Sequence, residues 1–125
     1  MDEEEADVAA PPADWAVQLL RFWFHDHKDS DWFGGGPEFD AKVTDRFAAW
    51  RDALRGLPVS SFSSDARTAL AAIILFDQVP RNAHRDTAEA FATDHIALGI
   101  ARAAVAHGLD AGLTKDERLF FYLPF

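Results

Sequence analysis

The chain has 125 residues, no cysteine, a net formal charge of −9 and an apolar fraction of 49%. This length fits one domain with a single core. The lack of cysteine excludes disulfides and thiolate metal sites, and the acidic balance disfavours nucleic-acid binding, which needs a basic face. No apolar run reaches the ~20 residues of a membrane span, so we expect a soluble, cytoplasmic protein whose partners include neither nucleic acid nor membrane.

Residues 1–12 predict a disordered acidic tail, because five of the first seven residues are Asp or Glu and the segment ends in two prolines. Setting those five acids aside leaves a net charge of about −4 for the remaining chain. An acidic start also argues against a secretory signal peptide, which has a basic segment before its apolar stretch. We expect residues 13–125 to form a single helical domain.

The first predicted helix extends from about Asp14, which suits the N-cap position, to Phe24. A loop is expected over residues 25–36, because its three consecutive glycines, Gly34 to Gly36, cannot continue a helix. These glycines lack the spacing of either phosphate-binding glycine motif and follow no strand, so we interpret them as a hinge or turn.

The second predicted helix has the clearest amphipathic pattern in the chain. Pro37 suits its first turn, and Gly56 and Pro58 end it. Its apolar residues recur at spacings of three and four, which places them on one helix face: Phe39, Val43, Phe47, Trp50 and Leu54.

The third predicted helix is apolar on every side through the segment ALAAIILF, which indicates a buried central helix. Ser63 or Ser64 is expected to cap its start, and Pro80 is expected to stop it. A turn should follow over residues 81–86.

The last two predicted helices have recognisable caps. Thr93 should cap the fourth helix, and Gly108 should end it, with Leu109 closing over the last turn. Residues 114–117, TKDE, form a capping box for the fifth helix. No alternation of period two is long enough to predict a strand. The expected fold class is therefore all-α, an antiparallel helix-hairpin stack of about five helices.

The segment DQVPRNAHR, residues 77–85, is unusual because it places a carboxylate at the end of an apolar helix. Such a group is costly near a core unless it is paired. In one interpretation Asp77 pairs with Arg81 or Arg85, while Gln78 and Asn82 bind open backbone groups. In the other, a guanidinium of this cluster binds a carboxylate or phosphate in a polar pocket. We favour the internal clamp, and all five residues remain ligand-binding candidates.

The triplet His25-Asp26-His27, with Asp29 and Asp31 nearby, offers possible metal ligands. It lacks the helical spacing of HExxH and specifies no third ligand, so we prefer a solvated turn and expect neither metal nor cofactor. None of the serines lies in a GxSxG elbow. Because no nucleophile with its base is recognisable, the sequence leaves open whether the chain is an enzyme.

Five segments share their order and spacing with one known family: LLRFWF (19–24), DWF (31–33), FDAKVTDRF (39–47), ALAAIILFDQVPRNAHRDTAEAFATD (69–94) and ERLFFYLPF (117–125). They resemble the DUF924 family, proteins of unknown function, over about residues 15–125. The resemblance implies an α/α superhelix of the tetratricopeptide-repeat-like type and no established activity. Family members look longer, which implies that this chain lacks the family's C-terminal helices.

Two classes of function are compatible with these features. The first is a helical binding or scaffold module for a protein, a peptide or a small anion. The alternative is a small enzyme that acts on an anionic small molecule at the cluster of Asp77, Arg81 and Arg85. The fold class does not decide between them, because helical stacks support many functions.

The C-terminal segment LFFYLPF carries more large apolar residues than one helix face can hide, because consecutive residues diverge by about 100°. We expect an exposed apolar patch there, and self-association through it. The residues concerned are Leu119, Phe120, Phe121, Leu123 and Phe125.

Overall fold

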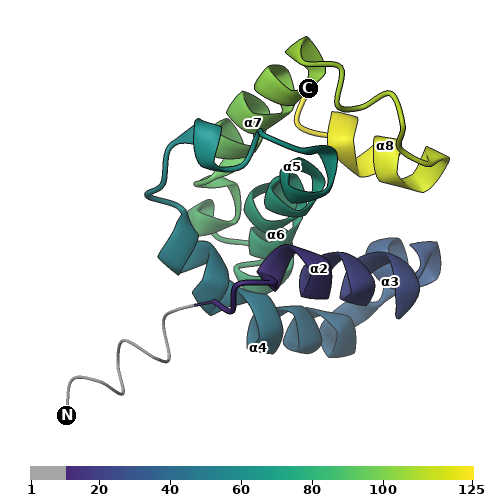
Figure 1. The fold of residues 1–125 in the computed structure, drawn as a ribbon. Coiled ribbons are helices and arrows are strands. Elements are labelled where there is room, and N and C mark those ends of the chain that lie inside the picture. The colour runs from purple at the N-terminus through teal and green to yellow at the C-terminus, as the bar shows by residue number, and fades with distance from the viewer. Residues whose placement is uncertain (1–10) are drawn as a thin grey trace.

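A computed structural model describes residues 11–125, and all regular elements of this part are helical, which confirms the all-α prediction (Figure 1). The α-helices are α2 (Trp15–Leu20), α3 (Asp29–Gly34), α4 (Gly36–Leu54), α5 (Ala66–Ile73), α6 (Val79–Ala83), α7 (Asp94–Ala106) and α8 (Lys115–Tyr122). Two π-helical turns, η1 (Arg21–His25) and η3 (Ile74–Gln78), and two 3-10 turns, η2 (Val59–Ser61) and η4 (Ala88–Phe91), complete them. Most of the predicted acidic tail lies outside the described residues.

The third predicted helix is the centre of the molecule, as its uniformly apolar sequence indicates. Residues 69–76 of α5 and η3 have no exposed surface. Helix α5 packs against α2, α7 and α8, while α4 packs against α6. In Figure 1, α5 has α2 and α4 on one side and α7 and α8 on the other. No helix of the described part is long and apolar enough to cross a membrane.

Pro80 does not stop the central helix, so that prediction is wrong. The chain widens into the π-helical turn η3, where the N–H of Val79 donates to the carbonyl of Ile74, five residues earlier. It then continues as α6, with Pro80 in the first turn. Proline is tolerated at that position because its missing N–H would have no partner in the new helix.

The loop predicted for residues 25–36 is also wrong, because it contains helix α3 and the first residue of α4. Tertiary contacts order this segment: Trp32 Nε1 donates a 2.8 Å hydrogen bond to the carbonyl of Trp23. The Trp32 ring also packs edge-on against Phe24 and Phe120. The helical run is interrupted at Gly35, and Gly36 has a φ of +66°, which favours glycine.

The predicted caps have mixed outcomes. Asp65, and not Ser63 or Ser64, caps α5 by accepting a 2.8 Å hydrogen bond from the N–H of Thr68. The glycine cap of α7 is confirmed: Gly108 has a φ of +72°, and the N–H of Leu109 donates to the carbonyl of Ala104.

Two other predicted caps stand at the expected N-cap positions but make no capping hydrogen bond. Asp14 accepts a hydrogen bond from the Gln18 side chain, and Thr93 uses its hydroxyl in the interior. The capping box between Thr114 and Glu117 is confirmed.

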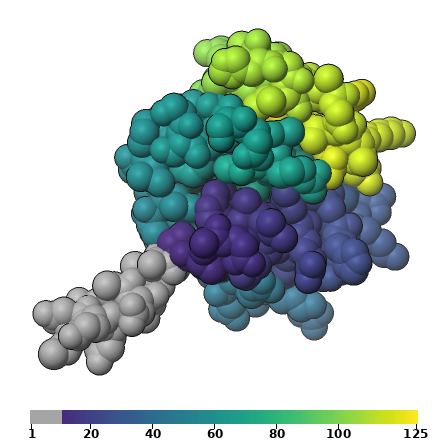
Figure 2. Space-filling model, in the orientation of Figure 1, coloured from purple at the N-terminus to yellow at the C-terminus, as the bar shows by residue number. Residues whose placement is uncertain are grey.

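The C-terminal segment buries part of its apolar surface and exposes the rest. Phe120 and Phe121 of α8 are buried, with Phe120 edge-on to Trp23. Figure 2 shows the surface of α8 meeting those of α2 and α5 on one face. The large side chains that stay exposed at this end are Leu119, Tyr122, Leu123 and Phe125.

Candidate functional site

Asp77 is buried, but the clamp expected around it is weak. Its carboxylate accepts a 2.6 Å hydrogen bond from Gln78 Nε2, whereas Arg81 Nη2 lies 3.6 Å from Asp77 Oδ1. At 3.6 Å, Arg81 and Asp77 form an ion pair but no hydrogen bond. Burial raises the pKa of Asp77, and the hydrogen bond from Gln78 opposes this shift only in part. The expected contact with Arg85 does not form, because Arg85 binds elsewhere.

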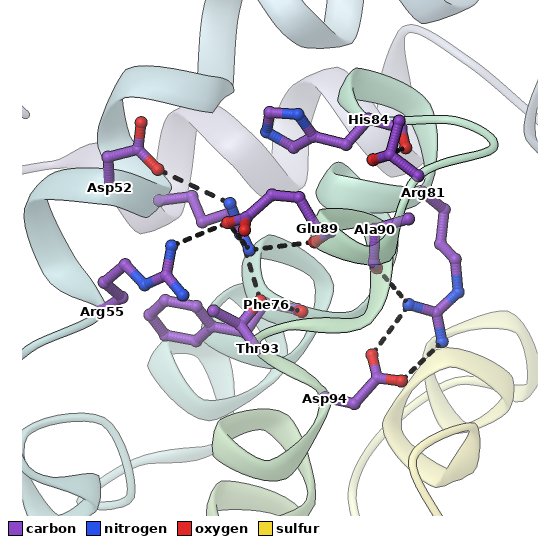
Figure 3. A network of polar contacts seen from close by, with 11 residues as sticks. Asp52, Arg55, Phe76, Arg81, His84, Glu89, Ala90, Thr93 and Asp94 are labelled. Atoms are coloured by element: carbon purple, nitrogen blue, oxygen red, sulfur yellow. Dashed lines mark hydrogen bonds and ion pairs between the residues drawn. The ribbon is translucent and has the colours of Figure 1, made fainter.

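Arg81 makes its strongest contacts with η4 and with the first residue of α7. Its guanidinium pairs with the carboxylate of Asp94 at 2.7 and 3.2 Å and donates a 2.8 Å hydrogen bond to the carbonyl of Ala90 (Figure 3). It also lies 4.6 Å from the ring centroid of Phe91. Arg81 therefore fastens α6 to the start of α7, a pairing that the sequence analysis did not anticipate.

Arg85 and Asn82 converge on Asp40 of α4, where neither was expected. Arg85 Nε and Nη2 bind the two carboxylate oxygens of Asp40 at 2.8 and 2.7 Å, and Asn82 Nδ2 donates to Oδ1 at 2.8 Å. The hydrogen bond from Arg85 holds the pKa of Asp40 below its usual value, more than burial raises it. Sequence reasoning missed Asp40 because 45 residues separate it from Arg85.

Arg51 is a fully buried arginine that the sequence analysis also missed. Its Nε donates a 3.1 Å hydrogen bond to the hydroxyl of Thr93, and its Nη2 lies 3.0 Å from Glu89 Oε2. Arg51 follows Phe47 by four residues, so the helical period places it on the buried face of α4. That spacing was a signal in the sequence that could have identified it.

A groove of about 450 Å³ opens beside Asp40, between α3, the start of α4 and the end of α6. We call it the α3–α6 groove. Aromatic side chains and the three glycines line one part of it, and Asp40, Asn82 and Arg85 line another. Of the five candidate residues, only Asn82 and Arg85 reach this groove, whereas Asp77, Gln78 and Arg81 do not. Its volume is in the range typical of ligand sites.

Comparison with known proteins identifies the family. The family model described as a bacterial protein of unknown function, DUF924, matches residues 19–125. This chain belongs to the DUF924 family. A solved structure of a protein of unknown function from Agrobacterium tumefaciens is similar to it, with a TM-score of 0.83 and 35% sequence identity. The match covers 90% of this chain and 63% of that one, and no curated protein matches.

In this DUF924 chain, the His25–Asp26–His27 triplet does not converge on one point. The side chain of His25 is exposed and lies 3.1 Å from Asp26 Oδ1, while His27 packs against the ring of Phe22. His27 Nδ1 donates to the carbonyl of Phe22 at 2.7 Å, so it is not part of a solvated turn. Within residues 11–125, no three histidine or acidic side chains are grouped as metal ligands.

Proposed function

We propose that this DUF924 chain is a helical binding module that holds a peptide segment of a partner protein in the α3–α6 groove. The observation that carries the proposal is the placement of Arg85 and Asn82 beside an aromatic-lined groove of about 450 Å³. Their common partner, Asp40, fixes both side chains before any ligand arrives. Such preorganisation lowers the entropic cost of binding.

The free polar atoms of the groove match a peptide bond. Arg85 uses Nε and Nη2 on Asp40, and its Nη1 makes no hydrogen bond within the described part of the chain. Asn82 likewise uses Nδ2, which leaves Oδ1 as an acceptor among the described residues. A peptide group offers a carbonyl for the first and an N–H for the second. The apolar side chain of such a ligand would contact the aromatic lining formed by Trp32, Phe33 and Phe39.

Charge disfavours the small anion considered from the sequence. The charged residues that line the groove, Asp31, Asp40 and Arg85, carry a formal net charge of −1. The guanidinium groups of Arg81 and Arg85 are each paired with a carboxylate of the chain itself. An enzyme acting on an anion at this cluster therefore has less support than a binding module, because binding would require breaking one of these pairs.

The packing supports the further inference that the helices stack in the tetratricopeptide-repeat-like manner. Helix α4 packs against α6, and α5 packs against α2, α7 and α8, as expected of helices stacked in layers. Such stacks commonly present an extended surface to peptides. We place the module in the cytoplasm, to which its cysteine-free composition is suited.

A thermal-shift panel tests this function, because a ligand of the native state raises the melting temperature by mass action. The probes are N-acetylphenylalaninamide, which carries two amide groups and an aromatic side chain, and inorganic phosphate. We expect the amide to raise the melting temperature with a saturating dose dependence and phosphate to have no such effect. Stabilisation by phosphate alone would replace the proposal with an anion site.

Two matched variants locate the effect. Asn82→Ala removes the acceptor in the groove and should abolish the response to the amide, measured against the variant's own melting temperature. Gln18→Ala truncates another side-chain amide, on α2, which among the described residues bonds to Asp14 alone, and should leave the response unchanged. An equal response in both variants would contradict a site at Asn82.

A further inference from the structure

A second groove lies along α2 and η1, and it shares no lining residue with the α3–α6 groove. It measures about 380 Å³ and is lined by Val17, Leu20, Arg21, Phe24, His25 and Arg67. We call it the α2–α5 groove, because Arg67 belongs to α5. On the face shown in Figure 2, the surface of α2 borders those of α5 and α8.

The floor of the α2–α5 groove is an apolar helix face. Val17, Leu20 and Phe24 follow one another at spacings of three and four, which places them on one side of the helix. Leu20 is buried, Phe24 is half-buried, and 58% of Val17 is exposed. Exposed aliphatic surface beside half-buried aromatic surface is the composition of a groove that receives an amphipathic helix.

The rim of the groove is basic in a chain whose net charge is −9. Its lining contains two guanidinium groups, at Arg21 and Arg67, and no acidic side chain. Arg67 Nη1 is bound to Glu117 Oε2 at 2.7 Å. Arg21 is exposed and has no hydrogen bond or ion pair to any residue in the 11–125 range, so none of these residues neutralises its charge.

We propose that the α2–α5 groove docks an acidic amphipathic helix of a partner protein. Leucine-like side chains of that helix cover Val17 and Phe24, and a carboxylate of its polar face pairs with Arg21. Charge complementarity selects this partner, because a basic or neutral helix would gain apolar burial alone. The proposal is independent of the α3–α6 groove, since the two sites share no residue.

Fluorescence anisotropy with synthetic peptides tests this docking. The probe is a labelled peptide of about 14 residues, or four helical turns, with Leu at spacings of three and four and Glu at the other positions. Its counterpart has Lys in place of every Glu. We expect saturable binding of the acidic peptide that weakens as salt is added, and no saturable binding of the basic one. Equal binding of both peptides, or of neither, would overturn the proposal.

Two pairs of variants assign the binding to the groove. Arg21→Glu should weaken the acidic peptide about tenfold or more, because it replaces an attraction with a repulsion. Arg102→Glu, on the exposed face of α7, changes the net charge equally and should leave the affinity within about twofold. Val17→Ser should weaken binding. Val105→Ser, which changes an exposed valine on α7 instead of α2, should not.

Circular dichroism and melting temperature confirm that each variant is folded, so that loss of binding is not loss of structure. If Arg21→Glu and Arg102→Glu weaken binding equally, the change in net charge explains the loss of affinity. The peptide then does not dock in the α2–α5 groove, and the proposal is wrong. If neither peptide binds and Arg21→Glu instead abolishes self-association of the parent, the groove is an interface between copies and the proposed partner is wrong.

Discussion

The hydroxyl of Thr93 donates a 2.7 Å hydrogen bond to the carbonyl oxygen of Phe76, in the buried centre of the molecule. In a regular helix the N–H of residue 80 would supply that bond, but residue 80 is proline and has no N–H. Arg51 Nε in turn donates to the Thr93 oxygen at 3.1 Å. The network in Figure 3 thus lets the central helix continue through a proline, by providing a donor from 17 residues further along the chain.

Replacing Thr93 with Val removes this hydroxyl while keeping the shape of the side chain. We expect Thr93→Val to lower the free energy of unfolding by about 2 kcal/mol, because it leaves the Phe76 carbonyl and one Arg51 N–H buried without partners. Urea denaturation measures the change. Thr87→Val, whose exposed hydroxyl donates to the carbonyl of His84, is the matched control and should cost less than about 0.5 kcal/mol.

Pro80→Ala provides a second test of the same relationship. The alanine restores a backbone N–H, which donates to the Phe76 carbonyl once the π-helical turn relaxes to regular α-helical geometry. Thr93→Val should therefore cost less in that background than in the parent. A double-mutant cycle measures the coupling, and we expect it to exceed about 0.5 kcal/mol. Additive effects of the two substitutions would mean that Pro80 does not create the need for the Thr93 hydroxyl.

The pH dependence of Asp77→Asn follows from the raised pKa of Asp77. Because its folded-state pKa lies above the unfolded value of 3.8, this carboxyl stabilises the fold at lower pH and loses that contribution as pH rises through the folded pKa. The asparagine keeps an acceptor for Gln78 without the buried charge. We expect the variant to be at least as stable as the parent at pH 7, with its advantage vanishing below about pH 4. Urea melts across this range check it, and a destabilised variant at pH 7 would be the contrary result.

Asp40→Asn should show the opposite pH dependence. The folded-state pKa of Asp40 is lowered, so its contribution is present above the unfolded value of 3.8 and is lost as pH falls through the folded pKa. We expect a loss of about 1 kcal/mol at pH 7, a modest value because the Arg85 side chain is 56% exposed. The difference from the parent should disappear in acid, and a loss independent of pH would exclude the ion pair as its cause.

The apolar residues exposed at the C-terminal end predict self-association of this chain. Light scattering over a dilution series should show a mass that rises with concentration. A Leu123→Ser, Phe125→Ser double variant should remain smaller at each concentration, because both side chains are exposed in the parent. A parent that stays monomeric at all concentrations and matches the variant would remove the basis for this interface.

Local patterns in the sequence were sufficient for most helices, since the stripe of α4, the apolar centre of α5 and the glycine cap of α7 depend on neighbouring residues. The site depends on distant pairs, which such patterns do not contain. Asp40 and Asn82 are 42 residues apart, as are Arg51 and Thr93. Helix α3 was missed for a related reason, because the packing of the Trp32 ring against Phe120 outweighs the local preference of a glycine-rich segment.

The family itself was recognisable from the sequence, and the match to the DUF924 model over residues 19–125 confirms it. The role of the DQVPRNAHR segment could be predicted from the sequence only in part. The burial of Asp77 could be predicted from its apolar neighbours, but the partners of Arg81 and Arg85 lie on α7 and α4. Pairing across elements is set by the packing of helices, which no local spacing specifies.

An amide-resolved NMR titration with N-acetylphenylalaninamide tests the central claim, that the α3–α6 groove binds a peptide group, most directly. We predict saturable chemical-shift changes concentrated at the backbone amides of Gly34, Gly35 and Gly36 and at the side-chain amide of Asn82, all of which line the groove. Changes that do not saturate, or that cluster instead at Val17, Arg21 and Phe24, would contradict it.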